Sequence, residues 1–206
     1  MFAIVESGSI TSMPKGNKGV EIDGVKHSSD IFTNKWTESE RNAIGVYTVE
    51  IDETNKKDEK WYINTNITYA VSGGKVKGTY GTATAKPHAD VLYTNTDKSN
   101  GNIPSDKDVG DVATEGLKTL WIRKIKQEAE GILNETDWYV TRKSEKSTAI
   151  PSSITTHRDA VRTKQAEMET AITNAADTPA LETLCTYARE EDGSYKRPLG
   201  ELPTLS

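Results

Sequence analysis

Cysteine and histidine are scarce in this chain, which has one cysteine and three histidines among its 206 residues. A single Cys185 excludes an intramolecular disulfide, and a reducing compartment fits this composition. Metal sites of the zinc type need several such ligands close together, whereas His27, His88 and His157 lie in three different segments. The composition therefore predicts neither a disulfide framework nor a bound metal.

Long apolar runs are lacking as well. No stretch approaches the roughly 18 apolar residues that span a bilayer, and no basic region followed by an apolar core opens the chain, so we expect neither a membrane contact nor a secretory signal. Hydrophobic residues make up 34% of the chain and charged residues 28%, which is polar for a compact globule. We expect an elongated protein with small cores, completed by a partner or by copies of itself as a homo-oligomer.

Positive charge is in deficit, because 31 acidic residues outweigh 26 Lys and Arg for a net charge of -5. Phosphate backbones bind to basic faces, so the charge argues against a nucleic-acid partner. Two short basic groups remain at 123–126 and 142–146. We interpret both as solvated surfaces in preference to binding patches.

Catalytic patterns are missing too. Cys185 follows Leu181 and Leu184 at the spacing of a buried helix residue, and no feature supplies the paired histidine of a catalytic thiol. The step Gly73-Gly74-Lys75 lacks both the upstream glycine and the following helix of a phosphate-binding loop. We therefore predict a protein that is not an enzyme and that uses no cofactor.

The patterns that are present indicate an α+β fold whose first part, residues 1–85, is rich in β-structure. Asp23-Gly24 predicts a tight hairpin turn. Thr37 and Glu40 have the spacing of a capping box for a short helix, which Gly45 ends. Apolar runs and alternation predict strands at 2–6, 20–22, 25–27 and 46–51, and a long hairpin of strands at 61–71 and 75–84.

Two segments are rich in turn formers and prolines. Residues 86–110 are predicted to be an extended linker with few contacts of its own. Residues 192–206 are predicted to be an extended Pro-rich tail that lies on a partner or subunit. His88 and Asp90, two apart in the linker, fit a surface loop better than a metal site.

Residues 111–191 predict a helical region. One helix carries an apolar stripe of residues three or four apart: Leu117, Leu120, Trp121, Ile125, Ala129, Ile132 and Leu133. A second starts near Pro151 and places on one face Ile154, Val161, Met168 and Ile172. Because neither helix can bury its stripe alone, we expect an antiparallel hairpin joined by a link over 138–150, and then a third short helix capped by Thr178.

The hairpin contains the spacings W-x-R, L-x-x-T-D-W and R-x-x-x-R, at Trp121, Arg123, Leu133, Thr136, Asp137, Trp138, Arg158 and Arg162. With this pattern, and with the opening segment 1–16, the Asp23-Gly24 step and residues 40–46, the chain resembles a family of tail-assembly chaperones of tailed bacteriophages. The resemblance implies a protein that helps tail fibres to fold or assemble by binding a fibre or another tail protein. It also implies a place in the host cytoplasm during assembly or in the virion tail.

The tryptophans of this pattern have two interpretations. Trp121 and Trp138 are either core anchors of the hairpin, which we favour, or one of them rims an exposed face and anchors a partner, because Trp and Arg are enriched in binding hot spots. Arg158 and Arg162 lie one helical turn apart and fit either an internal salt bridge, such as one to Asp137, or a partner contact. The candidate partner-binding set is Trp121, Arg123, Asp137, Trp138, Arg158 and Arg162.

Three functions are compatible with these observations. The first is a non-enzymatic factor that assists assembly or attachment of tail fibres. The second is a structural virion component, such as an adaptor or a fibre- or baseplate-associated subunit, that remains in the mature tail. The third, an enzyme that acts on host surface sugars, needs paired carboxylates at a cleft, and the sequence does not single out such a pair.

Overall fold

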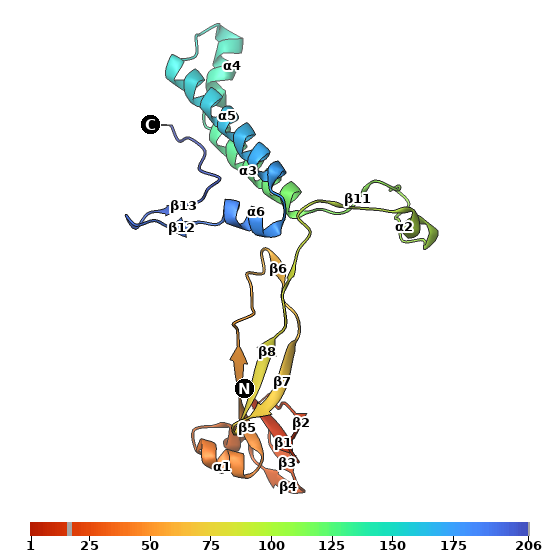
Figure 1. Cartoon of the computed structure of the whole chain (residues 1–206). Coiled ribbons are helices and arrows are strands. Elements are labelled where there is room, and N and C mark those ends of the chain that lie inside the picture. The colour runs from red at the N-terminus through yellow and green to blue at the C-terminus, as the bar shows by residue number, and fades with distance from the viewer. Residues whose placement is uncertain (16–17, 206) are drawn as a thin grey trace. The chain divides into compact units, whose positions relative to one another are not determined.

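The computed structural model describes residues 1–15 and 18–205, and its strands and helices confirm the α+β fold class (Figure 1). The chain divides into two compact units, Met1–Thr84 and Ala85–Ser206. Strands dominate the first unit, and the long helices lie in the second. Within the described ranges, no helix combines the length and the apolar character needed to cross a membrane.

A five-stranded sheet forms the centre of the first unit. Its order is β2 (Ser9–Ser12), β1 (Phe2–Glu6), β5 (Val46–Asp52), β8 (Lys75–Tyr80) and β7 (Ile67–Ser72). Neighbouring strands are antiparallel except β5 and β8, which run parallel with Val49 opposite Val76. A tight hairpin cannot join a parallel pair, so the chain passes through residues 53–74 between these two strands.

Strand β1 is covered on both faces. Successive side chains of a strand point to opposite faces, and here each face meets its own core. One core consists of Ala3, Val5, Val49 and Val76. The other consists of Ile4, Ile22, Ile31 and Val46. The continuous apolar run of β1 follows from this double burial.

The second core is closed by short elements on one side of the sheet. These are the hairpin of β3 (Val20–Ile22) and β4 (Val25–His27), the 3-10 helix η1 (Ser29–Phe32) and the helix α1 (Glu38–Ala43). Asp23 and Gly24 both have positive φ, of 49° and 77°, at the predicted turn. The capping box is also confirmed, because the Thr37 amide donates to the Glu40 carboxylate at 2.7 Å and the Glu40 amide donates to the Thr37 hydroxyl at 3.3 Å.

The predicted strand over 61–71 is divided in the structure. Trp61 and Tyr62 are buried, β6 (Tyr62–Ile63) pairs with β9 (Thr84–Ala85), and β7 begins at Ile67. The turn between β7 and β8 lies at 73–74, as predicted. Gly78 of β8 is required by packing, because a Cβ there would lie within 2.9 Å of side-chain atoms of Ile51, Ile67 and Tyr69.

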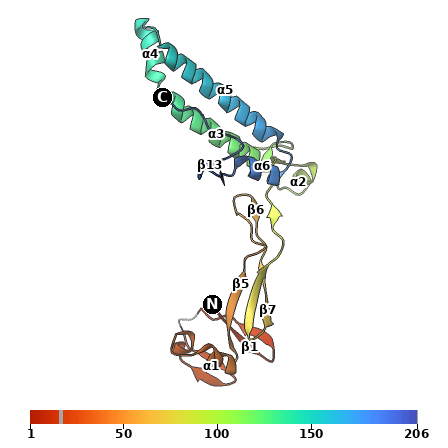
Figure 2. The same cartoon turned by 60° about the vertical axis from the view of Figure 1, so that its left-hand side comes forward.

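An antiparallel pair of helices forms the centre of the second unit, as predicted. α3 (Leu117–Asn134) and α5 (Ser152–Asn174) lie side by side along their length (Figures 1 and 2). The buried residues of α3 are Leu117, Ile125 and Ala129, and the buried apolar residues of α5 are Ile154, Val161, Met168 and Ile172. The two apolar stripes therefore cover one another, except at Leu120, which was predicted in the stripe of α3 but is 44% exposed.

A third short helix, α6 (Thr178–Cys185), follows the pair and buries Leu181 and Cys185. Its cap differs from the prediction. The Asp177 carboxylate accepts from the Ala180 amide at 2.8 Å, so Asp177 is the N-cap. The Thr178 hydroxyl instead donates to the Lys86 carbonyl at 2.6 Å.

The predicted link over 138–150 is wrong for most of its length, because α4 (Asp137–Lys146) occupies it. α4 ends at Ser147, which has a left-handed φ of 56° and donates its amide to the Lys143 carbonyl. A residue in this conformation stops a helix in the manner of a glycine cap. The sequence does not indicate this helix end, because serine rarely adopts positive φ.

The predicted linker over 86–110 is also wrong, because this segment belongs to the second unit. Its start bonds to the helices: the Pro87 and His88 carbonyls accept from the amides of Leu117 and Lys118 at 3.0 and 2.9 Å. Its remainder forms β10 (Val91–Leu92), α2 (Asn95–Ser99) and, past residue 110, β11 (Val112–Thr114), which pairs with β10. Hydrogen bonds between residues distant in sequence order this polar segment, and local composition cannot reveal them.

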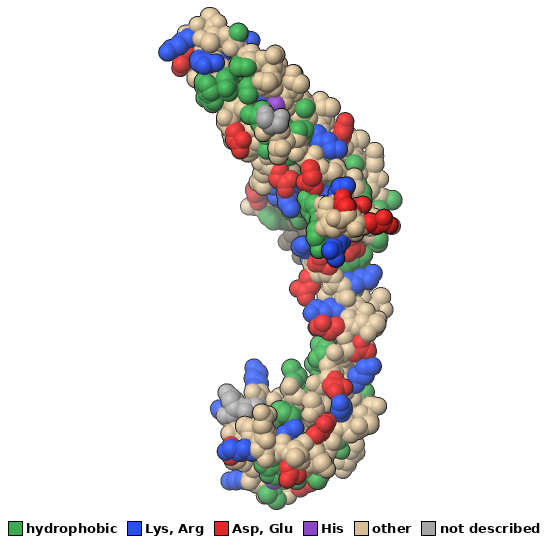
Figure 3. Space-filling model, turned by 90° about the vertical axis from the view of Figure 1, so that its left-hand side faces the viewer, with side chains coloured by type: hydrophobic (Ala, Val, Ile, Leu, Met, Phe, Trp, Pro, Cys, Tyr) green, Lys and Arg blue, Asp and Glu red, His purple; other side chains and the backbone are tan. Residues whose placement is uncertain are grey.

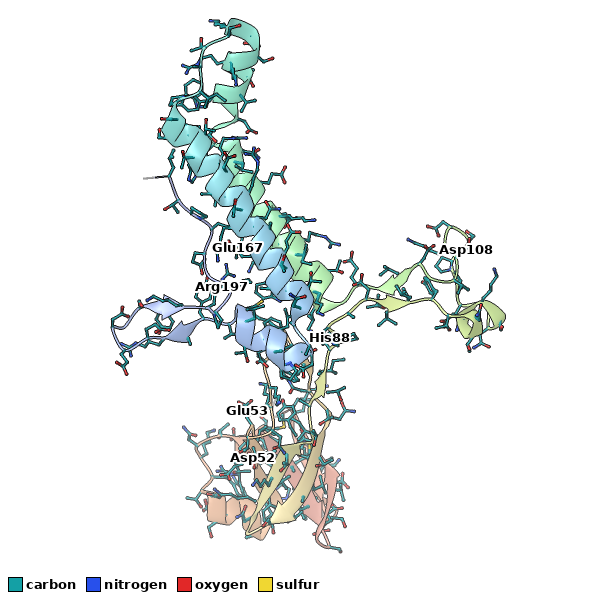
Figure 4. The ribbon with its side chains drawn as sticks, turned by 45° about the horizontal axis from the view of Figure 1, so that its top comes forward. Asp52, Glu53, His88, Asp108, Glu167 and Arg197 are labelled. Carbon is teal, nitrogen blue, oxygen red and sulfur yellow. The ribbon has the colours of Figure 1, made fainter. Side chains whose placement is uncertain are left out.

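The predicted extended tail over 192–206 folds back onto its own unit. β13 (Tyr195–Lys196) pairs with β12 (Ala188–Arg189), and the Leu199 amide donates to the Leu184 carbonyl at 3.0 Å. Leu199 and Leu202 are buried, and so is Arg197, whose position beside the helices is shown in Figure 4. The tail thus covers apolar surface of the second unit itself.

Candidate partner-binding site

Arg158 is the centre of a hydrogen-bonded cluster where three helices meet. Its guanidinium donates to the Leu133 carbonyl and to the Thr136 hydroxyl, each at 2.7 Å, and lies 2.8 Å from the Asp137 carboxylate. Arg158 and Thr136 are buried, whereas the Asp137 side chain is about half exposed. Residues from α3, α4 and α5 are therefore tied together by one side chain.

The cluster occupies the C-terminal end of α3, where the last carbonyls of a helix lack their usual intrahelical donors. The Leu133 carbonyl accepts here from the Thr136 amide at 3.1 Å and the Thr136 hydroxyl at 3.0 Å as well as from Arg158, and a cation near a helix C-terminus is favourable. Asp137 lies in the first turn of α4, where a carboxylate is favourable for the same electrostatic reason. Arg158 and Asp137 thus fix the corner between α3 and α4, and the internal interpretation of this pair agrees with their geometry.

The result of this corner is an exposed aromatic helix. None of the ten residues of α4, all of which the structure describes, is buried. Trp138 is 51% exposed and Val140 44% exposed. The core-anchor interpretation of Trp138 is therefore wrong, and the exposed-face interpretation agrees with the structure.

The Trp138 ring is part of a three-residue stack. It lies 3.8 Å from the Tyr139 ring between centroids, and the Arg142 guanidinium lies 4.7 Å from Trp138 and 5.2 Å from Tyr139. A cation over an aromatic face is attractive and holds both groups in place. The stack therefore presents a pre-ordered surface that is both apolar and cationic, as Figure 3 shows where hydrophobic and basic side chains gather at the end that carries α4.

The remaining candidates lie elsewhere on α3 and α5. Arg123 is about half exposed and pairs with Glu115, which raises the pKa of Arg123. Trp121 is partly buried, and the Lys124 ammonium lies 4.7 Å from its ring. The structure thus does not bring these candidates together with Trp138 in one cluster.

Arg162 lies one turn beyond Arg158, but its side chain is exposed and only 3.3 Å from Asp159. It lines an open groove of about 690 Å³ on α5, together with Leu133 and polar residues such as Gln165 and Glu169. The Gln165 amide donates to the Glu169 carboxylate at 2.8 Å. Several polar side chains of this groove already have partners within the chain, such as Gln165 with Glu169 and Arg162 with Asp159, and no aromatic ring is among its described lining residues. It is therefore a weaker binding surface than α4.

Three residues that shape the site were not predicted from the sequence: Tyr139, Arg142 and Asp90. Tyr139 and Arg142 complete the stack, and the spacing of Arg142 four residues after Trp138 was the available signal. Asp90 caps α3 from a distance, because its carboxylate accepts from the Gly116 amide at 2.6 Å and from the Thr119 hydroxyl at 2.7 Å. Those two donors lower the pKa of Asp90. Residues 26 and 29 positions apart carry no local signal of such a bond.

No group of three or more His, Cys, Asp or Glu side chains in the described part of the chain could hold a metal ion. Burial raises the pKa of Cys185 to about 11, so its thiol is protonated at neutral pH. The arrangement of α4 is instead suited to non-covalent contact, because aromatic and arginine side chains dominate binding hot spots.

No family model, no curated protein and no solved structure matches this chain.

Proposed function

We propose that this chain is a non-enzymatic phage tail protein that assists the assembly or attachment of tail fibres by binding a fibre or another tail protein through α4. The observation that carries the proposal is the role of the motif residues themselves. Thr136, Asp137 and Arg158, which carry the resemblance to tail-assembly chaperones, hold α4 so that Trp138 is exposed.

This arrangement supports a binding role on energetic grounds. A tryptophan left half exposed contributes little to a core, yet it can bury a large apolar area on a partner at low conformational cost. The stacked Arg142 is held by the two rings and loses little freedom when it binds. A partner with an apolar contact point flanked by acceptors would match this surface.

The test is co-expression with the tail-fibre protein of the same phage. We expect soluble, assembled fibres with the wild-type chain and loss of the complex with Trp138→Ala. Tyr195→Ala is the matched control, because Tyr195 is 66% exposed on β13 and lies outside α4. Fibres that assemble equally well without the chain, or binding that survives Trp138→Ala and fails with Tyr195→Ala, would contradict the proposal.

The fate of the chain after assembly separates a transient factor from a structural component. Mass spectrometry of purified particles measures this directly. A fixed copy number in the mature tail would assign the chain to the virion as an adaptor or a fibre-associated subunit. Its absence from the particle would assign it to assembly alone.

A further inference from the structure

Residues 91–114 form an arm with apolar side chains that its own unit does not cover. The arm consists of β10, α2 and β11, with Val91 opposite Thr114 and Leu92 opposite Val112. All residues of both strands are exposed, and the large apolar ones are Val91, Leu92 and Val112 at 38–46%. A two-stranded ribbon is marginal by itself in water, so this arm gains stability when its faces are covered.

The arm is acidic. It contains four aspartates, at 97, 106, 108 and 111, and two lysines, at 98 and 107, which gives a net charge of -2. The Asp108 side chain is 86% exposed, and its distance of 3.8 Å from the Lys98 ammonium is that of a weak pair. The arm therefore presents apolar side chains together with unneutralised carboxylates.

α4 has the opposite character. Its cations are Arg142, Lys143 and Lys146, and its anions are Glu145 and Asp137. Because Arg158 of α5 neutralises Asp137, three cations face one free anion, a balance of +2. Lys143 and Lys146 form no ion pair with any residue in the described part of the chain. The exposed Trp138 and Val140 lie on this same helix.

The arm and α4 of one chain are attached at opposite ends of α3. The arm ends at Thr114, just before α3 begins, whereas α4 follows the end of α3. An α-helix of 18 residues is about 27 Å long. The arm also leaves the helices in a direction away from α4 (Figures 1 and 2), and Figure 4 shows Asp108 on the part remote from them. The two surfaces do not cover each other within one copy.

We propose that the arm of one copy lies on α4 of a second copy. The arm supplies apolar side chains for Trp138, and its aspartates pair with Lys143 and Lys146. If each copy gives its arm to the other, both contacts form at once and the assembly closes as a two-fold dimer. The dimer does not depend on the proposed function, but a tail protein that binds α4 would compete with the second copy.

The experiment compares the mass in solution of two charge-reversed variants. One changes the arm, Asp106→Lys with Asp108→Lys, and the other changes α4, Lys143→Glu with Lys146→Glu. We expect the wild type to be dimeric by light scattering at micromolar concentration and to dissociate as salt screens the charges. Each variant alone should weaken the dimer at least about tenfold, because like charges then face one another.

An equimolar mixture of the two variants is the decisive sample. In a mixed dimer, the lysine-bearing arm of one variant lies on the glutamate-bearing α4 of the other. The unchanged arm of the second variant lies on the unchanged α4 of the first. Opposite charges meet at both contacts, so the mixed dimer should form. Glu190→Lys with Glu191→Lys is the control of equal charge change at exposed positions outside both surfaces, and it should remain dimeric. Circular dichroism confirms that every variant is folded.

Several results would overturn the proposal. A wild type that is monomeric throughout the micromolar range excludes it, and so does a mixture that stays monomeric. A dimer that both reversals leave intact places the interface elsewhere. The wild type could instead be monomeric and bind a polyglutamate peptide, with binding lost when the charges of α4 are reversed. That result would identify an acidic segment of another protein as the ligand of α4. Binding of a DNA oligonucleotide in place of the peptide would identify nucleic acid as the ligand.

Discussion

The guanidinium of Arg158 in α5 lies 2.8 Å from the carboxylate of Asp137 in the first turn of α4. The same guanidinium also bonds to Leu133 and Thr136. Since α4 buries none of its own residues, all of them described, its position depends on these bonds more than on packing. The stability of the corner and the exposure of the aromatic stack are therefore linked through one side chain.

Arg158→Ala should destabilise the second unit. It leaves the Leu133 carbonyl and the buried Thr136 hydroxyl without this donor, and hydrogen bonds to charged groups contribute about 1.5–3 kcal/mol each. Because Asp137 is half exposed, we expect a loss of about 2–3 kcal/mol in the free energy of unfolding. Urea unfolding followed by circular dichroism measures it. Arg162→Ala, at an exposed site one turn away, should change stability by no more than about 0.5 kcal/mol.

Trp138→Ala should leave stability nearly unchanged, within about 1 kcal/mol, because the side chain is half exposed. Trp61→Ala makes the matched comparison: Trp61 is 2% exposed, and truncation of a buried tryptophan costs about 3–5 kcal/mol. Thermal unfolding of both variants provides the measurement. A large loss of stability for Trp138→Ala would contradict this prediction and would mean that Trp138 packs in the core of the hairpin.

The sequence was most informative where local chemistry decides the structure. The turn at Asp23-Gly24, the capping box of Thr37 and Glu40, and the helix stripes all depend on residues a few positions apart, and all were predicted. The cap of Asp90 on α3 depends on residues far apart in sequence. The site shows the same contrast. The spacing left Arg158 with two alternatives, a salt bridge such as one to Asp137 or a partner contact, and the structure shows the salt bridge. The exposure of Trp138 depends on how three helices meet, which no local pattern reveals.

The fragment 85–205 should fold by itself, whereas 111–205 should be less stable. The longer fragment is one compact unit. The shorter one loses the Asp90 cap on α3 and the Lys86 carbonyl that accepts from Thr178. Loss of a cap alone costs about 1 kcal/mol, so Asp90→Ala in the longer fragment is a useful comparison. Equal melting temperatures for the two fragments would mean that residues 85–110 contribute nothing to the unit.

The Cys185 thiol should react slowly with thiol reagents at pH 7 and rapidly after unfolding, because the folded protein buries it and raises its pKa to about 11. An unfolded cysteine has a pKa of about 8.5. The neutral thiol is therefore favoured in the folded state, and its contribution to stability is present below about pH 8.5 and is lost as the pH rises towards 11. Denaturant midpoints from pH 7 to 10 should fall more steeply for the wild type than for Cys185→Ala. Equal slopes would show that the thiol is not responsible.

The parallel pairing of β5 with β8 also governs how fast the first unit can form. Val49 and Val76 meet only after the segment between them has closed into a loop, and pairings across long sequence separations slow folding. The helices of the second unit form from contacts within a few residues, on a much shorter timescale. During refolding, helical signal should therefore appear first, and the first unit would remain open, with the two faces of β1 uncovered, until β8 arrives. Those uncovered faces are where newly made chains would be most prone to aggregate.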